Sequence, residues 1–261
     1  MKLFLKISFL GTNYCGYQVQ NNAVTVQQMI NDASEKLFSF PCDVVGCSRT
    51  DSGVHANEFC LTVSKKGQPS LEHSVPVEKI PVAYNSLLPD DISVFDAFMV
   101  EDDFHSRYGV KYKEYIYKIW NGRVKDPFLC DRAFRCPFYI SGDALKDMNN
   151  AAKGFVGKHD FTSFMAKGSK ITDAVRTVYY ADVFEDGNTI VFRVAADGFL
   201  YNMVRIMVGT LIDVARKSIS SDDIPNIINA RDRALAGATA PAHGLYLNRV
   251  SYTDFEGSVN K

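Results

Sequence analysis

Alternating and helical hydrophobic patterns divide the first hundred residues into six elements. Apolar residues at every second position from Leu3 to Phe9 predict a strand. Apolar residues spaced three or four apart from Val26 to Leu37 predict a helix, which the Thr25 side chain can cap. The remaining patterns predict strands over residues 42–47, 59–63 and 92–98 and a helix over residues 77–88. The resulting order, β-α-β-β-α-β, is that of a ferredoxin-like split unit.

The same order of elements returns in the second half, although no sequence repeat is visible. An apolar stripe between Phe199 and Lys217 predicts a long helix. Strands are predicted over residues 110–120, 175–184, 189–195 and 245–252, and further helices over residues 145–155 and 222–230. We therefore expect an α+β fold in which two ferredoxin-like halves, residues 1–103 and 104–261, join into one mixed, mainly antiparallel sheet. Helices are expected on one side of this sheet, with a central cleft that the two halves share.

Composition limits the class of protein. The chain has 261 residues, of which 46% are hydrophobic and 23% are charged, as in an ordinary globular protein. No apolar run approaches the roughly 20 residues that a membrane span requires. Lys6 and Ser8 interrupt the apolar start of the chain, unlike a secretory signal, so we expect a cytoplasmic protein without a membrane partner. Its six cysteines form no Cys-x-x-Cys pair, so no zinc ribbon or thioredoxin-like site is indicated.

Basic residues are concentrated in the middle of the chain, although the formal net charge of the whole is only −1. Residues 105–176 hold 14 Lys or Arg and 7 Asp or Glu, which leaves a net charge of −8 for the remainder. This asymmetry is typical of a basic working face that binds a polyanion, and equally of a solvated face without a partner. Charge alone does not choose between the two.

The clearest chemistry lies in residues 46–56, which join two predicted strands. Arg49 and Asp51 are two residues apart, so an extended loop directs both side chains to one side. A neighbouring cation keeps a carboxylate ionised, which suits a nucleophile or a base, although an ordinary loop salt bridge has the same spacing. Asp51-Ser52-Gly53 also matches the aspartic-protease motif, but those enzymes need a second such Asp, and the sequence has none. Base-deaminase and phosphate-loop motifs are absent.

Segments that match one known family follow each other along nearly the whole chain. The segment from Gly46 to Ala56 strongly resembles the GRTD-x-GVHA loop of the TruA family of tRNA pseudouridine synthases. Other matching segments lie at residues 11–18, 25–27, 85–92, 104–107, 115–117, 159–164, 203–209 and 238–247. The sequence departs from the family pattern at Ser48, where Gly is more frequent, at Tyr17, where Trp is usual, and at Leu10, where Asp is common.

The resemblance implies a function and a set of site residues. Members of this family isomerise uridine to pseudouridine at positions 38 to 40 of the tRNA anticodon stem-loop, without a cofactor or a metal. Asp51 matches their catalytic carboxylate, which attacks the sugar, attacks the base or removes a sugar proton. Arg49 would hold the flipped nucleotide, and Tyr115 would pack on its base. Arg205 would pair with Asp51, and Leu245 would line the pocket. From the residues alone, strand core is the favoured interpretation of Tyr115, and a surface arginine is the favoured interpretation of Arg205.

The resemblance also implies a homodimer with tRNA as its partner, and the basic excess over residues 105–176 supplies candidate contacts to the RNA phosphates. The candidate phosphate contacts are Arg107, Lys111, Lys113, Lys167, Lys170 and Arg176. His55, His105 and His159 are expected to have structural or RNA-positioning roles. Two alternatives stay open, a non-catalytic RNA-binding module with this fold and a synthase with another uridine target. A pure binder would not need a carboxylate that faces phosphates, which favours catalysis.

Overall fold

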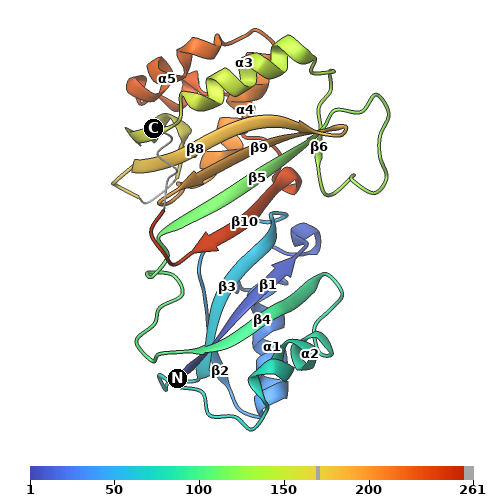
Figure 1. The fold of residues 1–261 in the computed structure, drawn as a ribbon, viewed down its shortest axis with the longest axis vertical. Helices are drawn as coiled ribbons and strands as arrows, with labels where there is room; N and C mark the ends of the chain where they lie inside the picture. Colours follow the sequence, from blue (N-terminus) through green and yellow to red (C-terminus); the bar gives the residue numbers. More distant parts are fainter. Residues whose placement is uncertain (169–170, 256–261) are drawn as a thin grey trace. The chain divides into compact units, whose positions relative to one another are not determined.

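The computed structural model describes residues 1–168 and 171–255, and their contacts divide the chain into two compact units (Figure 1). Unit 1 comprises Met1–Lys111 and Tyr246–Thr253, and unit 2 comprises Tyr112–Leu245 with the described residues after Thr253. The division differs from the expected boundary between residues 103 and 104. Unit 1 takes in a late segment because strand β10 (Leu245–Ser251) pairs in parallel with strand β3 (His55–Lys65).

Unit 1 is built on the strand order β4-β1-β3-β2, with all three pairings antiparallel. Its remaining elements are β1 (Lys2–Phe9), β2 (Cys42–Gly46), β4 (Ile92–Val100), α1 (Val26–Phe38) and α2 (Ile80–Asn85). The edge of β3 that faces away from β1 is shared by two strands. β10 pairs with its start, at His55 and Ala56, and β2 pairs with its end, from Leu61 onward. The connection from β2 to β3 therefore emerges between these two partners.

The helices of unit 1 follow from local sequence. The Thr25 hydroxyl accepts a hydrogen bond from the Gln28 amide at 3.3 Å, so α1 begins where the sequence predicts its cap. The second helix is shorter than the predicted 77–88, because a 3-10 turn over Val77–Lys79 precedes it. Helix α1 contacts β2, helix α2 contacts β4, and the two helices contact each other, so both cover the same face of the sheet.

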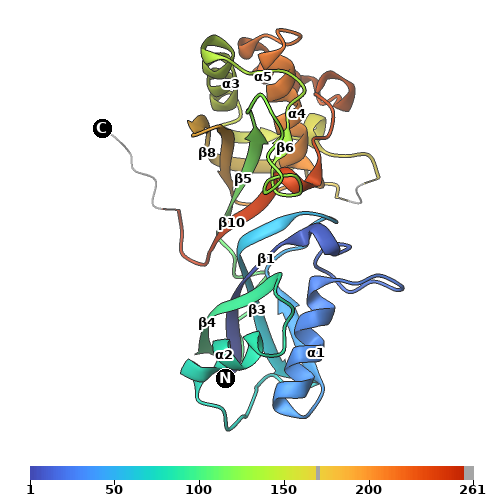
Figure 2. The ribbon, with the colours of Figure 1, turned by 90° about the vertical axis from the view of Figure 1, so that its right-hand side faces the viewer.

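Unit 2 has the antiparallel strand order β5-β9-β8-β7, with a short β6 paired in parallel with β5. Its strands are β5 (Tyr112–Trp120), β6 (Phe134–Arg135), β7 (Gly157–Asp160), β8 (Val175–Asp186) and β9 (Thr189–Ala196). Its helices are α3 (Gly142–Lys153), α4 (Met203–Ala215) and α5 (Ile224–Ala230). Figure 2 shows the three helices gathered on one side of β5 and β8.

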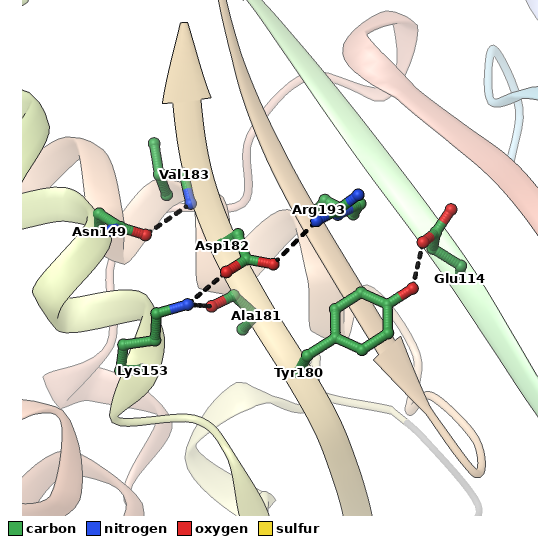
Figure 3. Close-up of polar contacts among 8 residues, drawn as sticks. All are labelled: Glu114, Asn149, Lys153, Tyr180, Ala181, Asp182, Val183 and Arg193. Carbon is green, nitrogen blue, oxygen red and sulfur yellow. Dashed lines mark hydrogen bonds and ion pairs between the residues drawn. The ribbon is translucent and has the colours of Figure 1, made fainter. Parts of the chain in front are cut away.

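A polar network ties α3 to the strands beneath it (Figure 3). The Lys153 ammonium forms an ion pair with the Asp182 carboxylate, whose second oxygen accepts from Arg193 at 3.2 Å. The Asn149 side-chain oxygen accepts from the Val183 amide at 3.0 Å. Because the bonds of Lys153 and Asn149 join α3 to a strand about 30 residues further along the chain, they fix where α3 lies on the sheet.

The α+β class and the mainly antiparallel pairing predicted from the sequence are confirmed in both units. The short strands β6 and β7 were not predicted. Among the described residues, no helix has the length and apolar content needed to cross a membrane.

Candidate active site

The connection between β2 and β3, residues 47–54, carries Arg49 and Asp51 and is called the Asp51 loop. Arg49 is exposed and Asp51 is half-buried. The Val54 amide donates to the Asp51 carbonyl oxygen at 3.2 Å, and Gly53 has a φ of +77°, which favours glycine. The chain therefore turns sharply directly after Asp51, and this turn displays the carboxylate.

A second segment, residues 11–17, holds the Asp51 loop and is called the first loop. The Tyr14 carbonyl oxygen accepts a hydrogen bond from the Ser52 hydroxyl at 3.2 Å. The Tyr17 amide donates to the Thr50 carbonyl oxygen at 3.3 Å. These bonds lie on both sides of Asp51 in the chain, so the first loop fixes the backbone that carries the carboxylate.

Two glycines of the first loop allow this close approach. Gly16 has a φ of +83°, and a β-carbon there would lie 2.5 Å from the Thr50 carbonyl oxygen. A β-carbon on Gly11 would lie 2.0 Å from the Val54 carbonyl oxygen. Any larger residue at either position would displace the Asp51 loop or the first loop.

The first loop is itself anchored by Asp91, the residue before β4. Tyr14 donates its hydroxyl to the Asp91 carboxylate at 2.5 Å, and Asn13 donates its amide to the other oxygen at 3.0 Å. Burial of Tyr14 and its hydrogen bond to Asp91 raise the pKa of the phenol, so the hydroxyl stays protonated as a donor. Sequence reasoning assigned no role to either residue, although both lie in segments that match the family pattern.

Two departures from the family pattern fit this architecture. The Tyr17 ring is buried and stacks on Phe59 with ring centroids 4.1 Å apart. A β-carbon on Gly46 would lie 2.5 Å from this ring, so the tyrosine fills the space behind the Asp51 loop. Ser48 is not among the described residues with positive φ, so a serine is compatible with the backbone there.

The histidines in the matching segments bond to the backbone. His55 is fully buried, and its Nδ1 accepts from the Gly11 amide at 2.9 Å. His105 Nδ1 accepts from the Arg107 amide at 3.1 Å, and His159 Nε2 lies 3.0 Å from the Val156 carbonyl oxygen. Among the described residues, no three His, Cys, Asp or Glu side chains gather as metal ligands would.

In unit 2, Arg205 lies in the first turn of α4 with its guanidinium fixed. Its Nε donates to the Ala240 carbonyl oxygen at 2.7 Å, and a terminal nitrogen donates to the Asn202 side chain at 2.8 Å. A β-carbon on Gly209 would lie 1.7 Å from the Ala238 carbonyl oxygen, so glycine is needed for this segment to pass against α4. That passage brings the Ala240 carbonyl to the arginine.

The other candidate residues of unit 2 are buried side chains. Tyr115 in β5 is 7% exposed, and its ring meets Phe199 edge to face with centroids 5.0 Å apart. Leu245, the first residue of β10, is 6% exposed. The structure thus groups Arg49 and Asp51 in unit 1, whereas Tyr115, Arg205 and Leu245 belong to unit 2.

The candidate phosphate contacts are spread over both units. Arg107 and Lys111 are exposed in unit 1, Lys167 is exposed in unit 2, and Lys113 and Arg176 are partly buried in unit 2. The Arg176 guanidinium donates to the Asp173 carbonyl oxygen at 3.1 Å. Lys170 lies outside the described residues.

Comparison with known proteins gives one consistent family over almost the whole chain. Residues 151–253 match the family model described as tRNA pseudouridine synthase. A tRNA pseudouridine synthase A of Clostridium acetobutylicum is 40% identical over 248 residues, which cover 95% of this chain and 98% of that protein. The protein of the same name from Bacillus licheniformis is 42% identical, over 97% of this chain and 99% of its own. A solved chain from a Cbf5-Nop10-Gar1 complex covers 94% of this chain and 49% of itself, at 14% identity and a TM-score of 0.38.

Proposed function

Because this chain belongs to the tRNA pseudouridine synthase family, we propose that it acts on the tRNA anticodon stem-loop, at positions 38 to 40, with Asp51 as catalytic carboxylate. As a member of that family it is an enzyme that isomerises uridine to pseudouridine in tRNA. In this reaction the bond from the ribose to N1 of uracil breaks and a bond from the ribose to C5 forms. The C5 hydrogen leaves to solvent, and N1 gains a proton, so substrate and product have the same composition.

The observation that carries the proposal is the way in which Asp51 is held. A carboxylate that acts on the ribose or the base must be positioned within about 3–3.5 Å of the reacting atom. The Ser52 hydroxyl donates to the Tyr14 carbonyl oxygen, and the Tyr17 amide donates to the Thr50 carbonyl oxygen, so the chain is restrained on both sides of Asp51. Catalytic residues are frequently found on loops that a rigid scaffold positions in this way. Attack on the sugar, attack on the base and removal of a sugar proton all require this placement of Asp51.

We propose complementary roles for four further residues. Extrusion of a base from a stem costs a few kcal/mol, so the flipped nucleotide needs contacts of its own. Exposed Arg49 would hold this nucleotide, and Tyr115 would pack on its base. Arg205 would pair with Asp51, and Leu245 would complete the pocket. If Arg205 pairs with Asp51, the double variant Arg205→Gln with Asp51→Asn will lose less free energy of unfolding than the sum of the losses in the two single variants, as measured by urea denaturation.

The proposed partners are tRNA and a second copy of the chain, in the cytoplasm. The proposed phosphate contacts are Arg107, Lys111, Lys113, Lys167, Lys170 and Arg176. The affinity for tRNA should fall as the salt concentration rises. Removal of any one of these cations should make the slope of log affinity against log salt less negative, by about 0.7 to 0.9. Sedimentation of the purified protein at micromolar concentration would measure its oligomeric state.

The target position can be tested with tRNA transcripts that carry tritium at uridine C5. Uridines at positions 38 to 40 are replaced by cytidine in a matched transcript that keeps all other uridines. We expect tritium release from the first transcript and none from the second. Equal release from both would assign the enzyme to another uridine. No release from any tRNA would contradict isomerisation itself.

A further inference from the structure

The segment between β5 and α3 forms a projecting arm, residues 121–140, that none of the proposed roles uses. Figure 1 shows it extending beyond the ends of β5 and β6. Its base is closed by two buried hydrogen bonds. The Asn121 side-chain amide donates to the Ile140 carbonyl oxygen at 2.9 Å, and the Ile140 amide donates back to the Asn121 side-chain oxygen at 2.9 Å. Because both partners are buried, these bonds are shielded from water and hold the two ends of the arm together.

The tip of the arm is a series of turns that present Phe128 to solvent. The Asp126 carboxylate accepts a hydrogen bond from the Phe128 amide at 2.9 Å, and the backbone carbonyl oxygen of Asp126 accepts one from the Leu129 amide at 3.2 Å. The Leu129 carbonyl oxygen in turn accepts from the Arg132 amide at 3.1 Å. The backbone on both sides of Phe128 is therefore fixed, yet its side chain is 82% exposed.

A single exposed apolar residue is ordinary on a protein surface, but this arm has several. Val124 is 74% exposed and Tyr139 is 64% exposed, in addition to Phe128. Four exposed cations lie in the same segment, namely Arg123, Lys125, Arg132 and Arg135. Its two acidic residues are Asp126, which is used in the turn, and Asp131.

We propose that this arm is a second RNA-contacting element, in which Phe128 stacks on an unpaired base of the tRNA and the surrounding cations bind phosphates. Proteins that hold unpaired nucleotides combine these two features, because every base has a face for stacking and every linkage a negative charge. The excess of cations in the arm complements RNA and disfavours an acidic or purely apolar partner. The inference rests on the proposed function only in that tRNA is the ligand.

The test compares Phe128→Ala, Phe128→Trp and the control Phe95→Ala, each in the full-length protein with unmodified tRNA. Phe95 is 49% exposed in β4 and has no assigned role, so its replacement controls for the loss of an exposed ring. We expect Phe128→Ala to raise the dissociation constant and KM at least about fivefold, while kcat at saturating tRNA stays unchanged. Phe128→Trp should bind as well as the wild type, because it keeps a stacking face. Phe95→Ala should behave as the wild type.

A second variant tests the cations separately. The double variant carries Lys125→Gln and Arg132→Gln. Its slope of log affinity against log salt should be less negative than that of the wild type, by about 0.7 for each phosphate that the protein no longer neutralises. Sedimentation of every variant accompanies the binding measurement.

Three results would overturn the inference. Wild-type affinity in Phe128→Ala would exclude stacking on the ring. Weaker binding together with loss of dimer mass would show that Phe128 packs against a second copy of the chain. If the wild type neither binds tRNA nor releases tritium from it, the proposed function fails as well, whereas the first two results leave it intact.

Discussion

Replacement of Gly16 by Ala tests whether the first loop positions the catalytic carboxylate. The new methyl group would lie 2.5 Å from the Thr50 carbonyl oxygen, next to Asp51 in the chain. β-Carbons essentially never approach another heavy atom closer than 3.0 Å, so one of the two loops must move by at least about half an ångström. The two loops are linked by hydrogen bonds on both sides of Asp51, so the carboxylate moves as well.

The size of the effect has two parts. An alanine at a φ of +83° costs about 1–2 kcal/mol in backbone strain, irrespective of its neighbours. Displacement of a catalytic group by about 1 Å can slow a reaction on the order of a hundredfold. We therefore expect Gly16→Ala to lower kcat by roughly ten- to a hundredfold and to lower the free energy of unfolding by more than the strain alone.

Gly67 is a matched control because it has a φ of +74° and no heavy atom within 4 Å of the position that a new methyl group would take. Gly67→Ala should show the same loss of stability from backbone strain but normal kcat. The assay is single-turnover tritium release at saturating tRNA, with urea denaturation of both variants. If Gly16→Ala retains normal kcat, or if both variants lose kcat equally, the first loop does not position Asp51.

Three further predictions concern residues that stabilise the folds of the two units. Tyr14→Phe removes the donor to Asp91 and should lower the free energy of unfolding by about 1.5–3 kcal/mol in urea denaturation. Gly209→Ala places a methyl group 1.7 Å from the Ala238 carbonyl oxygen, so it should destabilise the protein more than Gly67→Ala does, and an equal loss would contradict this. Burial and the charge of Arg205 lower the pKa of His243 below 6.5, its value in the unfolded chain. The neutral His243 therefore contributes its full stabilisation above pH 6.5, and this contribution is lost as the pH falls below 6.5 and through the lower pKa of the folded state. In thermal denaturation, the melting temperature of His243→Gln should fall less over this pH range than that of the wild type.

Elements with a strong local signal were predictable from the sequence. The start of α1 could be predicted because the hydrogen bond that caps it, from the Gln28 amide to the Thr25 hydroxyl, joins residues only three apart. The Asp51 loop could also be identified from the sequence, because its residues form one uninterrupted motif between two predicted strands. By contrast, β6 and β7 have two and four residues, too few for a periodic pattern to distinguish them from turns.

Contacts between distant parts of the chain could not be predicted in this way. The parallel pairing of Tyr246 with His55, which moves β10 into unit 1, depends on where two strands meet after folding. The anchor between Tyr14 and Asp91 spans 77 residues, and neither side chain is unusual in its own segment. Similarly, the requirement for glycine at position 16 comes from the approach of Thr50, which no local pattern records.

The most direct test of the central claim is tritium release by the wild type and by Asp51→Asn, with tRNA binding measured in parallel. Asparagine keeps the shape of the side chain but removes its charge and its capacity to act as a nucleophile or base. We predict release by the wild type and none above background by the variant, whose affinity for tRNA stays within a few-fold of normal. Release at the wild-type rate by Asp51→Asn would contradict the assignment of Asp51 as the catalytic carboxylate.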